Sequence, residues 1–295
     1  MTGTGKSPKS PRRTPYGSPI AFLYFIIAQA QGKRKGGPQK CCRAAAILTP
    51  APSYFTMNTK GVFTMSRDSI KMVAMLTMLI NHIANVFLPA GQPLTNLCLC
   101  IGYFTAVTMC FFLVEGYGCT RSKRRYAGRL LGFAVLAQLP YQLAFPANGI
   151  AGFVQFNMLF TLLLCFLVLL VQEKIQDRVL RGVCIVLLLC ASLFCDWALL
   201  APVFTLLFAW AGGNRTRQKA AFGAAALLYG GMAGLGSGQV WEAVGCAVPI
   251  LVSAFVILYL YNGRRAARGR TFYKWFFYAF YPAHLLVLGL LRLAV

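Results

Sequence analysis

The twenty residues Phe153–Gln172, FVQFNMLFTLLLCFLVLLVQ, are almost entirely apolar. Their length is what an α-helix needs to cross roughly 30 Å of hydrocarbon. The apolar residues run on without a break, whereas a strand of a membrane barrel alternates apolar and polar residues. Because only helices and closed barrels satisfy every backbone hydrogen bond inside lipid, this stretch predicts a membrane-spanning helix.

Comparable apolar runs recur along the chain, which has 295 residues, of which 58% are hydrophobic and 12% are charged. A soluble domain carries about 25% charged residues, so this chain lacks the charge to cover a water-exposed surface. We therefore expect an all-α fold, a polytopic transmembrane helical bundle of nine spans in residues 65–295. The predicted spans are Ser69–Leu88, Leu94–Gly116, Ala127–Phe145, Phe153–Gln172, Val179–Cys195, Trp197–Gly212, Ala220–Leu235, Val240–Asn262 and Phe272–Leu293.

Positive charge is distributed unevenly between these spans. The second, fourth, sixth and eighth connectors carry Lys and Arg, and the other four carry neither. Cytoplasmic connectors are enriched in these residues. The pattern predicts that the bundle begins in the cytoplasm and ends outside it, as a multi-pass protein of the cell membrane, expected to be a bacterial cytoplasmic membrane. The lipid bilayer is therefore an expected partner.

Residues 1–64 differ from the rest of the chain. They hold ten of the 29 basic residues, no acidic residue, and much Pro, Ser and Gly. The apolar run Pro19–Ala30 is too short to span a membrane. We expect a basic, disordered extension or the product of an upstream start codon, with a signal or targeting segment as the alternative. The net charge of +23 does not predict a nucleic-acid partner, since no basic domain studded with aromatic residues lies outside this extension.

The only two histidines are His82, in the first predicted span, and His284, in the last. A histidine inside a span is costly unless it is paired, hydrated or used. Asn81 and Asn85 lie beside His82, where an amide can orient the imidazole of a general base. The alternative is two buried histidines bonded to carbonyls or amides. Two histidines are too few ligands to predict a metal site.

A basic cluster follows the second span. It either orients the protein in the membrane or binds phosphate groups from the cytoplasm, because Arg pairs well with phosphate. Glu115, near the end of that span, is expected to pair with Arg121 or Arg129, or to belong to the site. Asn157 is a further polar residue within a span. The cluster comprises Arg121, Arg124, Arg125 and Arg129, together with Tyr126.

Three stretches resemble the TraX family. SIKMVAMLTMLINHIANVF, residues 69–87, is similar to its methionine-rich first helix, which carries an acidic residue followed by histidine. CFFLVEGYGCTRSKRRYAGRL, residues 110–130, resembles its second helix and basic loop, and FFYAFYPAHLLVL, residues 276–288, resembles its closing motif. The resemblance covers residues 65–295. This chain departs from the family at Asn81, where the family usually has Asp.

The resemblance implies an integral-membrane acetyltransferase that moves an acetyl group from acetyl-CoA to an amine or hydroxyl acceptor. The type member is linked to N-acetylation of conjugative pilin, and a wider group of similar enzymes modifies sugars outside the cytoplasm. The acceptor here is expected to be a pilin-like protein, a cell-surface sugar or another group. The CoA phosphates would bind the basic cluster, His82 would act as general base with Asn81 or Asn85 orienting it, and His284 with Tyr281 would hold the thioester or stabilise the oxyanion.

Two other functions fit the same residues. In a transporter or permease, the polar residues would line a substrate or proton path. In a non-catalytic scaffold descended from such an enzyme, Asn81 would mark the loss of catalysis, because an amide does not stabilise an imidazolium by charge. Flux that needs no acetyl-CoA would favour the transporter, and activity gained on placing Asp at position 81 would favour the scaffold.

Overall fold

A computed structural model describes residues 55–57, 63–146, 154–266 and 269–294. Nine α-helices occupy most of these residues, which confirms the predicted all-α fold. They are α2 (Arg67–Phe87), α3 (Pro93–Cys119), α4 (Lys123–Ala144), α5 (Met158–Lys174), α6 (Arg178–Ala191), α7 (Leu200–Ala211), α8 (Arg215–Ser237), α9 (Val240–Phe255) and α10 (Arg270–Ala294). A 3₁₀ turn, η2 (Ser192–Phe194), follows α6, and a π-helical turn, η3 (Val256–Leu260), extends α9.

Each predicted span coincides with one of these helices, and five of the described helices are long and apolar enough to cross a membrane. The five are α2, α3, α8, α9 continued by η3, and α10 from Thr271. Helix α7 is apolar but shorter, and the 17 residues of α5 extend about 26 Å at 1.5 Å per residue. The structure thus describes a helical membrane protein, while nine spans and the orientation stay predictions.

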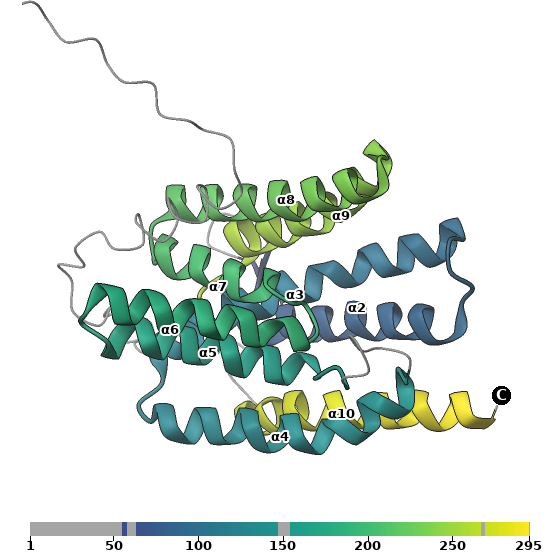
Figure 1. Ribbon diagram of the computed structural model, residues 1–295, viewed down its shortest axis with the longest axis horizontal. Helices are drawn as coiled ribbons and strands as arrows, with labels where there is room; N and C mark the ends of the chain where they lie inside the picture. The colour runs from purple at the N-terminus through teal and green to yellow at the C-terminus, as the bar shows by residue number, and fades with distance from the viewer. Residues whose placement is uncertain (1–54, 58–62, 147–153, 267–268, 295) are drawn as a thin grey trace, which may run out of the picture. The chain divides into compact units, whose positions relative to one another are not determined.

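Successive helices run in opposite directions, so their connectors lie alternately at two ends of the bundle (Figure 1). Side-chain bonds tie one of these ends together. Glu173, at the end of α5, accepts from Tyr117 of α3 and Lys123 of α4, and Arg215 of α8 donates to the Leu258 carbonyl of η3. We call this the basic end, because the four Lys- and Arg-bearing connectors gather there; the opposite end is the far end.

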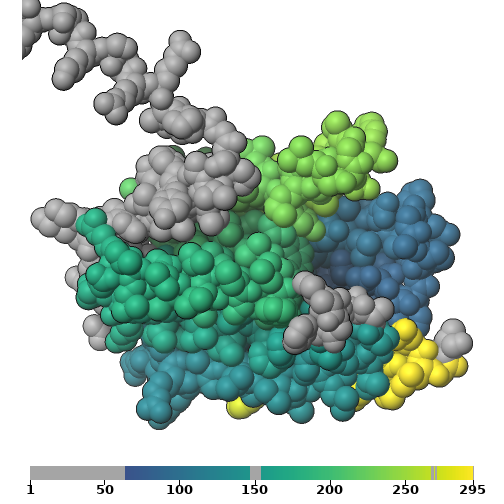
Figure 2. Space-filling model, in the orientation of Figure 1, coloured from purple at the N-terminus to yellow at the C-terminus, as the bar shows by residue number. Residues whose placement is uncertain are grey.

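Three pairs of helices pack most extensively: the consecutive helices α2 and α3, the consecutive helices α8 and α9, and α4 with α10, which are distant in sequence. A glycine allows the first of these approaches. A Cβ at Gly102 of α3 would lie 2.3 Å from the Cβ of Asn81 on α2, so only glycine fits there. The outer faces are apolar, with Leu139 of α4 69% exposed and Leu187 of α6 63% exposed, as lipid contact requires. In Figure 2, α4, α5 and α6 lie at the surface on the side of the protein that faces the viewer.

The described part of residues 1–64 contains an antiparallel hairpin of β1 (Phe55–Met57) and β2 (Phe63–Met65). Its last residue, Met65, bridges to Tyr261, and the backbone N–H of Arg67 donates to the Arg264 carbonyl at 2.8 Å. The segment that precedes α2 is therefore hydrogen-bonded through its backbone to the connector between η3 and α10. Residues 1–54 and 58–62, which make up most of the predicted extension, lie outside the described residues.

Candidate functional site

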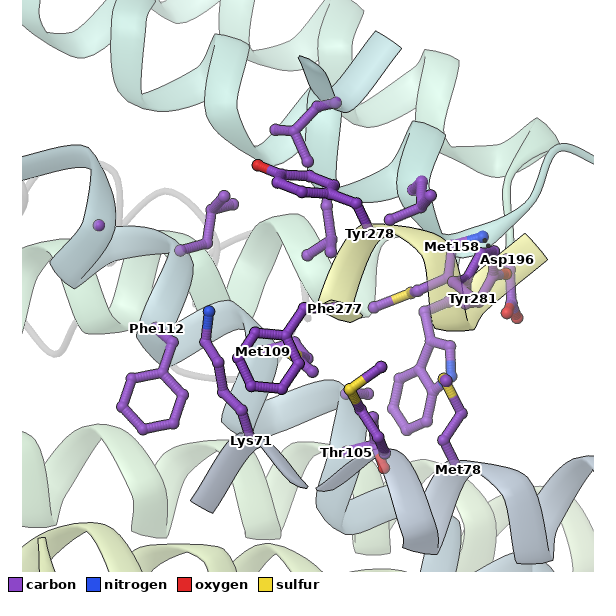
Figure 3. A pocket seen from close by; sticks show the side chains of 18 of the residues that line it. Lys71, Met78, Thr105, Met109, Phe112, Met158, Asp196, Phe277, Tyr278 and Tyr281 are labelled. Carbon is purple, nitrogen blue, oxygen red and sulfur yellow. Dashed lines mark hydrogen bonds between the residues drawn. The ribbon is translucent and has the colours of Figure 1, made fainter. Parts of the chain in front are cut away.

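A cavity of about 800 Å³ runs inside the bundle, lined by α2, α3, α4, α5, α8, α10 and the connector between η2 and α7. Both Arg67 and His82 of α2 line it. They are fifteen residues apart, which corresponds to about 22 Å along the helix axis. The cavity therefore extends from the basic end to the level of the histidines, and Figure 3 shows part of its wall.

Cationic side chains line the cavity at the basic end. Of the predicted cluster, Arg121, Arg125, Arg129 and Tyr126 line the cavity and Arg124 does not. Sequence reasoning missed the remaining cations, although a lysine two residues into a predicted span is itself a signal. These further lining cations are Arg67, Lys71, Arg265 and Lys274.

Two of the cations lack the partners that buried charges normally have. Nε of Arg129 is buried without a hydrogen-bond partner. Nζ of Lys71 lies 5.8 Å from the ring centre of Phe112 and 5.3 Å from that of Phe277, and no carboxylate among the described residues forms an ion pair with it (Figure 3). Because an uncompensated buried charge is costly, these groups are suited to binding an anionic ligand.

Glu115 does not pair with Arg121 or Arg129, so that prediction is wrong. Its Oε2 lies 3.8 Å from Nε of Arg67, and its Oε1 accepts from the Tyr261 hydroxyl at 2.6 Å. Arg67 also donates to the Phe112 carbonyl at 2.9 Å. The reason is that the segment before α2 is bonded to the connector between η3 and α10, through contacts of Met65 with Tyr261 and of Arg67 with Arg264, which brings Arg67 beside the end of α3. Glu115 thus joins α2, α3 and the segment after η3, and it does not line the cavity.

The middle of the cavity is apolar. Its wall is made of flexible side chains from four helices, and methionine thioethers adapt readily to the shape of a ligand. The basic end and the histidine level are thereby joined through a section without charge. The residues of this section include Met75, Met78, Met109, Met158 and Phe277.

The two histidines contact each other, with Nε2 of His284 3.1 Å from Nδ1 of His82. Nδ1 of His284 lies 2.8 Å from the Phe280 carbonyl, which only accepts, so this nitrogen carries the hydrogen. In a neutral His284, Nε2 then accepts, and Nδ1 of His82 donates to it. Nε2 of His82 keeps its lone pair, and no bond to it is found among the described residues. His82 lines the cavity and His284 lies outside its lining.

The asparagines do not orient His82 as expected. The amide of Asn81 donates to the Leu99 carbonyl of α3 at 2.9 Å, because consecutive helical residues point about 100° apart. The prediction that Asn81 holds the imidazole is therefore not met by this structure, in which His284 takes that place. Asn85 lines the cavity near the far end, and among the described residues it forms no hydrogen bond with either imidazole ring.

Tyr281 and Asn157 lie on the α4–α5–α10 side of the bundle. The Tyr281 hydroxyl accepts from the Met158 backbone N–H at 3.2 Å, so its own hydrogen is available to a ligand in the cavity it lines. Asn157 donates to the Ala134 carbonyl at 2.8 Å and accepts from the Leu159 N–H at 3.0 Å. Asn157 is thus a helix cap that fixes the start of α5.

Asp196 and Trp197, in the connector between η2 and α7, also line the cavity. Sequence reasoning did not assign them to the site, although an acidic residue in a short connector between apolar segments was the available signal. Within the described residues, no three His, Cys, Asp or Glu side chains are close enough to hold a metal ion.

Comparisons with known proteins agree with the architecture. The model of a family described as TraX protein matches residues 66–292. The chain is similar to a protein of Dichelobacter nodosus named "Probable fimbrial assembly protein FimC, serogroup H1", with 33% identity over 234 residues that cover 76% of this chain and 94% of the relative. No solved structure matches.

Proposed function

The chain belongs to the TraX family, and from that premise we propose that it is an integral-membrane acetyltransferase that moves an acetyl group from acetyl-CoA to an amine or hydroxyl acceptor. The observation that carries the proposal is one continuous cavity, which is lined by the cations Lys71 and Arg129 at one end and by His82, with its free Nε2, at the other. Acetyl-CoA is a long donor whose phosphates would match the cationic end of this cavity and whose thioester would match the end with His82.

The cations of the basic end supply the donor site. Arg121, Arg125 and Arg129 line one side of the cavity and Lys71 lies deeper, between two aromatic rings. Guanidinium groups bind phosphate oxygens in pairs, and an ammonium group adds a point charge. The apolar section beyond them suits the uncharged arm of the donor, and it excludes the water that would hydrolyse a thioester.

His82 is the general base in this proposal. Its Nε2 takes the proton of the acceptor N–H or O–H as the acceptor attacks the thioester carbonyl, and the same nitrogen later returns that proton to the departing sulfur. His284 does not touch the reactants. Its Nε2 accepts from Nδ1 of His82, which fixes the ring and stabilises the positive charge that the ring acquires. In the same proposal the Tyr281 hydroxyl donates to the developing oxyanion, and the bond that its oxygen accepts from the Met158 N–H supports this role.

The relative from Dichelobacter nodosus is named as a fimbrial assembly protein. By analogy, a subunit of a surface fibre is one acceptor that this protein would modify, and a surface saccharide is another. Both would be presented in or across the cell membrane. The predicted orientation places the histidine level towards the outside and the cations towards cytoplasmic acetyl-CoA.

The same cavity makes a transporter the second candidate, because it links a charged end with polar residues about 22 Å away along α2. The two functions are separated by reconstituting the purified protein in vesicles with a membrane extract as acceptor source and acetyl-labelled acetyl-CoA. An acetyltransferase yields label covalently bound to extract material. Label that crosses the membrane without becoming bound supports the transporter and contradicts the proposal.

A further inference from the structure

Asp196 lies in a strained turn. Trp197 and Leu199, the only non-glycine residues with positive φ in the described part of the chain, have φ of 58° and 60°. Such a conformation costs about 1–3 kcal/mol per residue and persists only where the surroundings enforce it, most often at functional sites. Two such residues within three positions of one carboxylate call for an explanation beyond packing.

The surroundings enforce this turn through its backbone. The Asp196 N–H donates to the Phe156 carbonyl at 2.8 Å, and the Asp196 carbonyl accepts from the Thr161 hydroxyl at 2.5 Å. The Leu199 N–H donates to the Ser192 hydroxyl at 3.1 Å. These bonds anchor the turn to the start of α5 and to η2. The first two use main-chain atoms of Asp196, whose side chain lines the cavity.

The carboxylate of Asp196 has no cationic partner among the described residues. The backbone N–H of Trp197 bonds to it, and the nearby titratable groups are Tyr281 of α10 and Cys195 of its own turn, with Tyr141 of α4 close to Tyr281. Burial raises the pKa of Asp196 to about 6. Figure 3 shows the side chain beside Tyr281 and Met158, well separated from Lys71.

Asp196 and His82 belong to one level of the bundle. Asn81, next to His82, touches Gly102, and the adjacent Tyr103 lies 5.7 Å from the Trp197 ring. On the other side, His284 lies 5.6 Å from the Tyr281 ring, and Tyr281 lies beside Asp196. Contacts on both sides thus connect His82 with Asp196, and both residues line the cavity at this level.

Three aromatic rings form the remaining wall at this level. Trp197, Tyr103 and Tyr229 lie 5.0 to 5.7 Å apart, and all three line the cavity. An apolar wall beside a carboxylate binds a group that has a flat or methylene-rich body and hydrogen-bond donors at its end. Neither an anionic donor nor its phosphates fit beside Asp196.

We propose that Asp196 is the residue that binds the acceptor, receiving its N–H or O–H hydrogens while the aromatic rings of Trp197, Tyr103 and Tyr229 hold its body. The inference rests on the proposed function and assigns the second substrate to the far side of His82. Amines and hydroxyls share the donor chemistry, and the product distinguishes them, because hydroxylamine cleaves an acetyl ester and leaves an acetamide intact.

The test measures acetyl transfer from acetyl-CoA to a membrane extract by wild type, Asp196→Asn, Asp196→Glu and the control Asp177→Asn. Asp177 caps α6, an N-cap that Asn also provides, so its variant should match wild type. Asp196→Asn should lower the rate at least tenfold with acetyl-CoA affinity unchanged, and Asp196→Glu should recover part of it. The wild-type rate should fall as pH drops through about 6, where Asp196 gains a proton, and Asp196→Asn should lose a smaller fraction of its rate over the same drop.

Equal rates and equal pH profiles of wild type and Asp196→Asn overturn this inference alone, whereas no transfer by wild type contradicts the proposed function as well. A second measurement needs no transfer. Dicyclohexylcarbodiimide adds to protonated carboxyl groups in apolar surroundings, so it should modify Asp196 faster as pH falls towards 6, as read by mass spectrometry. Asp68 and Glu115, which are hydrogen-bonded or ion-paired, should react more slowly. An unmodified Asp196 overturns the inference.

Discussion

Nε2 of His284 accepts a hydrogen bond from Nδ1 of His82 across 3.1 Å, which joins the first and last described helices through residues 202 positions apart. The bond from Nδ1 of His284 to the Phe280 carbonyl decides which histidine donates and which accepts, because it places the hydrogen of His284 on Nδ1 and leaves its Nε2 as the acceptor. The two rings are therefore not equivalent: His82 lines the cavity and keeps a lone pair on Nε2, whereas His284 lies outside the lining and accepts from His82.

This inequality predicts different losses at the two positions. We expect His284→Gln to lower kcat for acetyl transfer by about 10- to 100-fold, in the range of a lost orienting hydrogen bond, with little change in KM for acetyl-CoA. Steady-state kinetics at several pH values check this, since a positioning residue also shifts the pH profile of its neighbour. A His284→Gln variant as inactive as His82→Gln, or one with altered KM alone, would refute the assigned order.

Arg129 and Arg124 lie on the same helix, but only Arg129 lines the cavity. We expect Arg129→Gln to weaken acetyl-CoA binding about tenfold, equivalent to roughly 1.4 kcal/mol, while Arg124→Gln binds like wild type. Titration calorimetry in detergent measures both affinities. The Arg129 effect should shrink at high salt, as expected for a charge contact. Equal losses in the two variants would mean that only the net charge of the connector matters.

The contact of Asn81 predicts what an aspartate would do there. Its amide donates to the Leu99 carbonyl, and a carboxylate would instead face that oxygen without a hydrogen. Asn81→Asp should destabilise the protein by about 1–3 kcal/mol and should not raise activity. Thermal unfolding in detergent and the transfer assay measure the two effects. Higher activity in this variant would favour the alternative that the protein is a non-catalytic scaffold descended from such an enzyme.

Gly102 predicts a second, purely steric effect at the same helix contact. A methyl group there would overlap Asn81, so Gly102→Ala should lower stability by about 1–3 kcal/mol. Gly128 of α4 has open space around the equivalent atom, and Gly128→Ala should raise stability by about 0.5–1 kcal/mol. Comparing the two thermal midpoints tests whether α2 and α3 approach as closely as described. Similar midpoints would contradict that approach.

The positions of the helices followed from the sequence because continuous apolar runs and charged connectors reflect local requirements of the bilayer. The family followed from motifs around His82 and His284, and the match over residues 66–292 confirms it. The two wrong predictions concern the contacts of individual side chains. Glu115 met Arg67 instead of Arg121 or Arg129, and Asn81 met Leu99 instead of His82.

These errors share a physical cause. A partner within one connector is visible in the sequence, whereas Arg67 reaches Glu115 only because the segment before α2 is fastened to the segment after η3. Asp196 was missed for a similar reason. Its role depends on a strained turn held by Phe156 and Thr161, and neither the strain nor the contacts appear in the residue pattern.

The role of His82 as general base is tested most directly by measuring acetyl transfer from acetyl-CoA to a membrane acceptor by purified wild type and His82→Gln. Ile83→Ala, on the lipid-exposed side of the same helix, is the control. We predict that wild type and Ile83→Ala transfer label, and that His82→Gln loses at least a hundredfold in rate while it binds acetyl-CoA with wild-type affinity. A His82→Gln variant that transfers acetyl groups at the wild-type rate would contradict the assignment of His82 as general base.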